Sequence, residues 1–168
     1  MRILIYGFKP YGSYSSNITE QVLAGLSDNQ SVVKKVFDVR FDEAMFSEVL
    51  LQYKPDRVLG LGQHPRARKL RLERRAQNLR KDIGQSPVQI ELTAPRFLYC
   101  TLALPESDLT TVTYNAGNYV CNFSMYLMSR YCQSHNTKFG FVHVPMHYAV
   151  STVTRYVQTA LRHILQYS

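Results

Sequence analysis

The sequence has no tryptophan and only three cysteines, at positions 100, 121 and 132. No two of them form a C-x-x-C pair, and any disulfide scheme leaves one thiol over, which excludes the usual structural zinc patterns and is typical of a reducing compartment. No apolar run approaches the roughly 20 residues of a membrane span. The apolar start, MRILIYGF, is too short for a signal-peptide core. We therefore expect a cytoplasmic protein without a membrane segment.

Acidic residues are also scarce, with 12 Asp and Glu against 20 Lys and Arg, a net charge of +8. The excess is concentrated in a basic segment, residues 66–81, which contains Arg66, Arg68, Lys69, Arg71, Arg74, Arg75, Arg80 and Lys81. Such a cluster can attract RNA or an acidic partner. Because no RNP-like, KH-like or zinc-finger pattern accompanies the charge, we favour a solvated basic face over nucleic-acid binding.

Strand-like and helix-like segments alternate along the chain, which predicts a single α/β domain over residues 1–168. We expect a three-layer helix-sheet-helix sandwich with a largely parallel mixed sheet. The expected strands are 2–6, 32–39, 57–61, 88–92 and 138–144, with an extended piece near 99–104. The expected helices run from Asn17 to 26, from Asp42 to 53, from Asn118, and from about Val150. In such sheets, sites lie in the loops at the carboxyl ends of strands, here after Tyr6, Leu61 and Val144.

Cys121 lies in YNAGNYVCNFSMYLMSRYC (residues 114–132), where Cys121, Met125, Met128 and Cys132 form one helical stripe. This stripe is typical of a helix packed into a core, where free cysteine behaves as a small hydrophobe. Position favours another interpretation for Cys121, because Asn118 as helix N-cap would put it third in the helix. There the helix dipole can lower the thiol pKa below about 8.5. Cys121 is therefore a candidate nucleophile and Cys132 is not.

His143 and Glu73 are candidate partners for that nucleophile. His143 stands near the end of the apolar strand FGFVHVP, as a core residue or as the base that a cysteine nucleophile needs. Glu73 is the only acid in LRLERRAQN, either a charge-balancing surface residue or a carboxylate that orients an imidazole. His143 and His147 have H-x-x-x-H spacing, but Pro145 breaks the helix that such a metal pair requires, so we expect no metal and no cofactor.

The glycine-flanked stretch GFKPYG (residues 7–12) is not a phosphate-binding loop. It matches neither G-x-G-x-x-G nor a Walker motif, and Pro10 removes a backbone donor. Phe8 and Tyr11 either line a pocket or belong to the core.

Four segments in this order resemble the pyroglutamyl peptidase I family, also called pyrrolidone-carboxylate peptidases: GFKPYG, GLGQ with LERRAQN (60–78), YNAGNYVCN (114–122) and GFVHVP (140–145). The resemblance implies an α/β sandwich in which a Cys-His-Glu triad removes amino-terminal pyroglutamate from peptides. It assigns Cys121 as nucleophile, His143 as base and then acid, and Glu73 as orienter. It also implies that Phe8 and Tyr11 hold the lactam ring and that Gln63 contacts its amide edge. Asn17 matches a family asparagine that we interpret as a helix cap.

Two features depart from that family. The family arginine thought to assist the oxyanion falls on Ile83, with Arg80 as a substitute if the loop shifts. KDIGQSP (residues 81–87) replaces the usual loop, and the segment after the HVP strand end is short. We therefore expect altered substrate preference or assembly, and homo-oligomerisation stays open. Two alternatives remain: the same triad acting on another lactam or amide, or a non-catalytic module that binds RNA or an acidic partner through residues 66–81.

Overall fold

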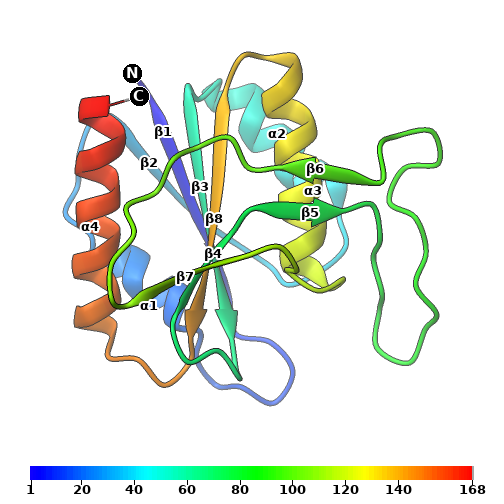
Figure 1. The fold of residues 1–168 in the computed structure, drawn as a ribbon, viewed down its shortest axis with the longest axis horizontal. Helices are drawn as coiled ribbons and strands as arrows, with labels where there is room; N and C mark the ends of the chain where they lie inside the picture. The colour runs from blue at the N-terminus through cyan, green and yellow to red at the C-terminus, as the bar shows by residue number, and fades with distance from the viewer. Residues whose placement is uncertain (168) are drawn as a thin grey trace.

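The computed structural model describes residues 1–167, in which a six-stranded mixed sheet lies between two helical layers (Figure 1). The strand order is β2-β1-β3-β8-β4-β7, and every neighbouring pair is parallel except β4 with β8. The strands are β1 (Ile3–Phe8), β2 (Val32–Phe37), β3 (Arg57–His64), β4 (Leu70–Glu73), β7 (Thr110–Thr113) and β8 (Lys138–Pro145).

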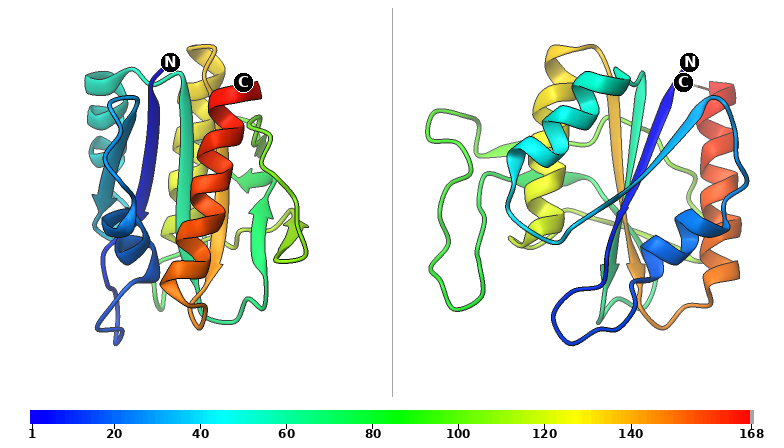
Figure 2. Two further views of the ribbon diagram at one scale, coloured as in Figure 1. Left: turned by 90° about the vertical axis from the view of Figure 1, so that its left-hand side faces the viewer. Right: turned by 180° about the vertical axis from the view of Figure 1, so that it is seen from behind.

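The helices cover both faces of this sheet. Helices α1 (Ile18–Gly25) and α4 (Val150–Tyr167) lie on one face, and α2 (Glu43–Tyr53) and α3 (Val120–Ser134) on the other (Figure 2). A small antiparallel ribbon of β5 (Arg75–Gln77) and β6 (Phe97–Tyr99) lies outside the main sheet, next to α3. The predicted three-layer α/β sandwich with a largely parallel mixed sheet is confirmed.

Strand alternation divides the core into two layers. In β1, Ile3 and Ile5 pack with the α1 and α4 side, whereas Leu4 and Tyr6 pack with the α2 and α3 side. This follows from the period of two, which turns successive side chains to opposite faces of a strand. The same alternation determines which side chains of β3, β4 and β8 face α3.

The helix starts agree closely with the sequence pattern. Asn17 is the N-cap of α1, and its side chain accepts a hydrogen bond from the backbone N–H of Thr19 at 3.0 Å. Helix α3 begins at Val120 with Tyr119 as its cap, one residue after the predicted cap Asn118. Cys121 is therefore second in the helix instead of third. Cys132, at the other end of the helical stripe, is a core residue as predicted, with 3% exposure.

Two parts of the strand prediction are wrong. The segment 88–92 is no strand: it makes one isolated bridge between Val88 and Arg80, and Leu92 is 86% exposed because nothing covers it. Conversely, β4, β5 and β7 form where no strand was predicted. Within the described residues no helix is both long and apolar enough to cross a bilayer.

Candidate active site

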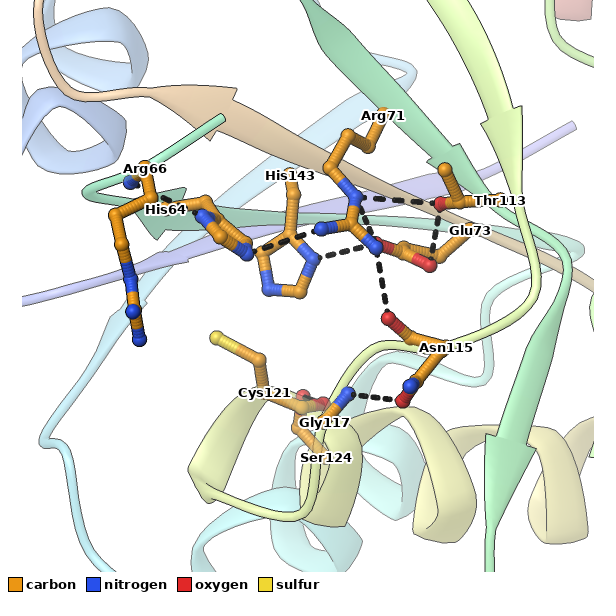
Figure 3. A network of polar contacts seen from close by, with 10 residues as sticks. All are labelled: His64, Arg66, Arg71, Glu73, Thr113, Asn115, Gly117, Cys121, Ser124 and His143. Carbon is orange, nitrogen blue, oxygen red and sulfur yellow. Dashed lines mark hydrogen bonds and ion pairs between the residues drawn. The ribbon is translucent and has the colours of Figure 1, made fainter. Parts of the chain in front are cut away.

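Two neighbouring strands, β8 and β4, direct their site residues toward the start of α3. In β8 the side chains of Val142 and Val144 belong to the α1 and α4 side, so His143 faces α3. In β4, Leu72 likewise packs on the α1 and α4 side, which turns Glu73 to the α3 side. Strand alternation thus brings Glu73 and His143 together beside the start of the helix that carries Cys121 (Figure 3).

His143 and Glu73 form a buried hydrogen-bonded pair. Nδ1 of His143 is 2.8 Å from Oε1 of Glu73, and the Thr113 hydroxyl donates to Oε2 at 2.6 Å. Burial alone would raise the pKa of Glu73, but His143, Thr113 and Arg71 outweigh it and hold this pKa below its usual value. Glu73 is therefore a carboxylate that accepts the Nδ1 proton of His143, which leaves Nε2 available as a base.

The thiol of Cys121 lies against a glycine of β3. A Cβ on Gly62 would be 2.7 Å from Sγ of Cys121 and 3.1 Å from Cδ2 of His143, so only glycine leaves room for both side chains. In Figure 3 the sulfur points from α3 toward the strand ends that carry His143 and His64. In the part of the chain that the structure describes, no hydrogen bond joins this sulfur to the imidazole; such contacts often form only when substrate binds.

The expected lowering of the Cys121 pKa by the helix start is wrong. Burial, with a smaller contribution from the negative Glu73, raises the pKa of this thiol to about 12. The free-energy cost of removing water from a charged sulfur is larger here than the stabilisation that the helix dipole provides. Cys121 therefore rests as a thiol and needs a base to become a nucleophile.

A cavity of about 160 Å³ opens beside this thiol. Its apolar lining includes the predicted ring-binding residues Phe8 and Tyr11, and its polar lining includes Gln63, Cys121 and His143. Gln63 is only 6% exposed, and its Oε1 accepts from the Ile18 N–H at 3.0 Å. Its Nε2 makes no hydrogen bond of standard geometry and has only a weak interaction with the Tyr11 hydroxyl. A buried amide donor without a well-aligned acceptor is costly, so this cavity favours a ligand with a carbonyl group.

The first turn of α3 offers backbone donors to the same cavity. The first i to i−4 bond of the helix comes from the Phe123 N–H to the Tyr119 carbonyl at 3.0 Å. The earlier N–H groups, including that of Cys121, have no intrahelical acceptor. Together with the dipole, they favour negative charge that develops next to the thiol.

Sequence reasoning missed several residues of this network. Arg71 and His64 lie beside the His143 and Glu73 pair, with Thr113 and Asn115 on the segment before α3 (Figure 3). The available signal was the alternation of LRLE, in which Leu70 and Leu72 pack into the core while Arg71 and Glu73 face the site. This short alternation is difficult to recognise in the sequence because many of the residues around it are Lys or Arg.

The basic segment 66–81 does not form one continuous face. Arg71 pairs with Glu73, Arg75 stacks over Phe97 and Arg80 over Phe41. Arg80 lines a neighbouring cavity of about 480 Å³ and not the cavity at Cys121, while Ile83 is 81% exposed.

No cluster of three or more His, Cys, Asp or Glu residues suited to a metal ion occurs in residues 1–167. His147 is exposed in the turn that follows β8.

Comparisons with known proteins show which sequences this chain resembles. The pyroglutamyl peptidase family profile matches residues 1–87 and 100–157. Pyrrolidone-carboxylate peptidase 1 of Caldanaerobacter subterraneus is 31% identical, with 86% of this chain and 82% of the relative covered. The Thermococcus litoralis relative is 30% identical, covering 86% of this chain and 76% of the relative.

Solved structures match the same fold. The pyrrolidone carboxyl peptidase from Thermococcus litoralis superposes with a TM-score of 0.85 at 24% identity, covering 99% of this chain and 94% of that one. Pyroglutamyl peptidase I from Bacillus amyloliquefaciens gives a TM-score of 0.85 at 21% identity, covering 99% and 95%.

Proposed function

This chain belongs to the pyroglutamyl peptidase family, and we propose that Cys121, His143 and Glu73 are its catalytic triad. It is a cysteine hydrolase, a pyrrolidone-carboxylate peptidase, and its substrate is a peptide with an amino-terminal pyroglutamyl residue. The observation that carries the triad is the buried 2.8 Å bond between His143 and Glu73 next to the Cys121 cavity. A carboxylate, an imidazole and a nucleophile in this order are the groups that acyl transfer requires.

In the first half of the reaction, Nε2 of His143 takes the Cys121 proton as sulfur bonds to the pyroglutamyl carbonyl carbon. The α3 N–H groups stabilise the oxyanion. His143 then donates its proton to the leaving amine as the C–N bond breaks, which leaves a thioester on Cys121. In the second half, His143 takes a proton from water, whose oxygen bonds to the acyl carbon. As the C–S bond breaks, His143 returns this proton to the Cys121 sulfur and pyroglutamate is released. Glu73 stabilises the imidazolium formed in each half.

The raised pKa of Cys121 fits this sequence of steps. A thiol with a pKa of about 12 is almost fully protonated at neutral pH, so its proton must leave during the attack. His143 is the neighbouring base, with Nδ1 already engaged by Glu73. The proposal therefore has His143 act as a general base on a neutral thiol.

We propose that the cavity next to Cys121 binds the lactam ring. Phe8 and Tyr11 supply apolar faces, and Nε2 of Gln63 supplies a donor for the lactam carbonyl. Burial raises the pKa of Tyr11 to about 12, so its ring presents a neutral phenol. A charged glutamyl or glutaminyl amino group would find no carboxylate among the lining residues, which favours the cyclised ring.

A panel of aminoacyl amides tests this function. We expect hydrolysis of a pyroglutamyl amide, and rates at least about 100-fold lower for the prolyl and glutaminyl amides, which lack the lactam carbonyl or carry a charge. Initial rates of amine release measure this. Preference for a different lactam or amide would replace the substrate and keep the triad, whereas no thiol-sensitive hydrolysis with any amide would favour the binding module.

Gln63→Leu should raise KM for the pyroglutamyl amide. Loss of the buried donor removes one hydrogen bond to the lactam carbonyl, a difference of about 1–3 kcal/mol, or roughly 5- to 150-fold in kcat/KM. Steady-state kinetics on the pyroglutamyl and prolyl amides measure it, and the prolyl rate should change less. An equal loss on both substrates would mean that Gln63 only supports the Ile18 backbone through its Oε1.

We propose a cytoplasmic location for this chain. Cys100, Cys121 and Cys132 are all free, which supports work in a reducing, cytoplasmic compartment. Self-association of the chain stays a prediction.

A further inference from the structure

Arg71 contacts three separate parts of the site: β4, the end of β3 and the segment before α3. It lies on β4 opposite His143 of β8, and its side chain is 22% exposed. Its Nε is 3.1 Å from Oε1 of Glu73, and its Nη2 donates to the Asn115 carbonyl at 2.8 Å. Its Nη1 is 3.1 Å from Nε2 of His64, which must accept because a guanidinium only donates.

We propose that Arg71 is a positioning residue of this hydrolase: its guanidinium clamps Glu73, the end of β3 and the segment before Cys121 into one arrangement. The inference rests on the proposed triad.

Arg71 supplies the positive charge that is paired with the buried Glu73 carboxylate. The side chain of Glu73 is fully buried, and Arg71 is the only Lys or Arg paired with it within residues 1–167. An isolated buried carboxylate would take up a proton and lose its hold on His143. Arg71 is always charged, so its attraction adds to the hydrogen bonds of His143 and Thr113 that hold the pKa of Glu73 below its usual value.

Arg71 also holds the segment that precedes α3 in place. Asn115 begins the turn that leads into α3, and its side chain accepts from the Gly117 N–H at 3.0 Å. By holding the Asn115 carbonyl, Arg71 connects the strand of Glu73 to the segment that places Cys121 (Figure 3). A planar fork with several donors can hold these acceptors together, and a lysine ammonium on a flexible stem cannot do so equally well.

The charged and titratable groups around His143 are few. Within residues 1–167 they are Glu73 and Arg71 on β4, Cys121 on α3 and His64 on β3, whose ring centroid is 5.1 Å from that of His143. The phenols of Tyr11 and Tyr119 line the same cavity, and the Cys100 thiol lies near Glu73. Burial, with His143 and Arg71, lowers the pKa of His64 to about 4, so His64 is neutral through the working range. Thr113 on β7 is uncharged. Removal of Arg71 thus deletes the only permanent positive charge of this group.

Arg71 does not line the cavity at Cys121, so its loss should act on turnover and not on substrate affinity. For Arg71→Met we expect kcat for the pyroglutamyl amide to fall at least tenfold while KM changes less than threefold. Without the positive charge of Arg71, the pKa of Glu73 should rise, so the acid limb of the kcat/KM profile should move to higher pH.

Arg71→Lys separates charge from geometry. It keeps the positive charge, so its acid limb should stay near the wild-type position, but it loses the fork, so kcat should still fall. Lys69→Met is the matched control: it removes a positive charge from an exposed residue of the same basic segment and should leave kcat and the pH profile unchanged.

The outcomes are distinguishable from failure of the triad itself. If the wild type hydrolyses the amide and Arg71→Met keeps its kcat and acid limb, the positioning role is overturned and the triad stands. Melting curves show whether each variant is folded at the assay temperature. If Arg71→Met is not, Arg71→Lys decides, and a native kcat in that variant overturns the proposal. An inactive wild type would instead refute the proposed function.

Discussion

Cys121→Ala should abolish hydrolysis of the pyroglutamyl amide, with a loss of at least about 10⁴-fold in kcat. The reason is that no other group near the cavity can form the thioester. Cys100 and Cys132 are buried, at 5% and 3% exposure, and do not line the cavity. The fold should survive, because the substitution removes one sulfur beside Gly62. Kinetics with a sensitive fluorogenic amide, together with mass spectrometry of the acylated protein, measure the effect.

Cys132→Ala is the control for this prediction. Cys132 lies on the same helical stripe of α3 but in the core. The Cys132→Ala variant should therefore keep the wild-type kcat at temperatures where it is folded. Its melting temperature should be lower than that of the wild type, because core packing is lost. A Cys121→Ala protein that still turned over at the native rate would refute the nucleophile. A Cys132→Ala protein that was folded but inactive would mean that Cys132, and not Cys121, is the nucleophile.

His143→Gln should reduce kcat by about 10²–10⁴-fold, the usual contribution of general acid–base catalysis. The effect should be large here because the Cys121 thiol, with its pKa of about 12, cannot ionise on its own at neutral pH. Activity of the variant should therefore rise as the pH increases toward 12. The wild type should not show this rise, because His143 removes the thiol proton. Steady-state rates from pH 6 to 10 on the pyroglutamyl amide measure both the loss and the slope.

His147→Gln provides the matched histidine control, because His147 lies four residues further on in an exposed turn. It should retain the wild-type kcat and pH profile. If His143→Gln lost less than tenfold and showed no dependence on pH, His143 would not be the base that the thiol needs.

The site residues could be nominated one by one from the sequence, but their meeting could not be derived from residue spacing. Cys121 stood at a helix start and His143 at a strand end, both recognisable from local pattern. Glu73 was harder, because β4 is only four residues long and lies within a run of arginines and lysines. Strand β4 pairs with β8 in an antiparallel direction. This placement depends on the packing of Leu70 and Leu72 into the core on the α1 and α4 side of the sheet.

The thiol pKa shows the same limit from another direction. A helix start predicts a lowered value, and this is a local property of the backbone. The raised value comes from burial of the thiol beneath residues distant in the chain, such as Gly62, and from the charge of Glu73. Likewise, nothing in the pattern of residues 66–81 indicated that Arg71 would turn inward while Arg75 and Arg80 stack on aromatic rings.

The sequence by itself determined the alternation of strands and helices, the N-cap of α1, the buried stripe of α3 and, through its motifs, the family. These are local or periodic properties, so neighbouring residues suffice to specify them. Only the tertiary structure decided which strand lies beside which, that Arg71 and Glu73 share a face with His143, and that the Cys121 thiol is protonated at rest. Those properties depend on contacts and burial between distant segments, which exist only once the sheet has formed.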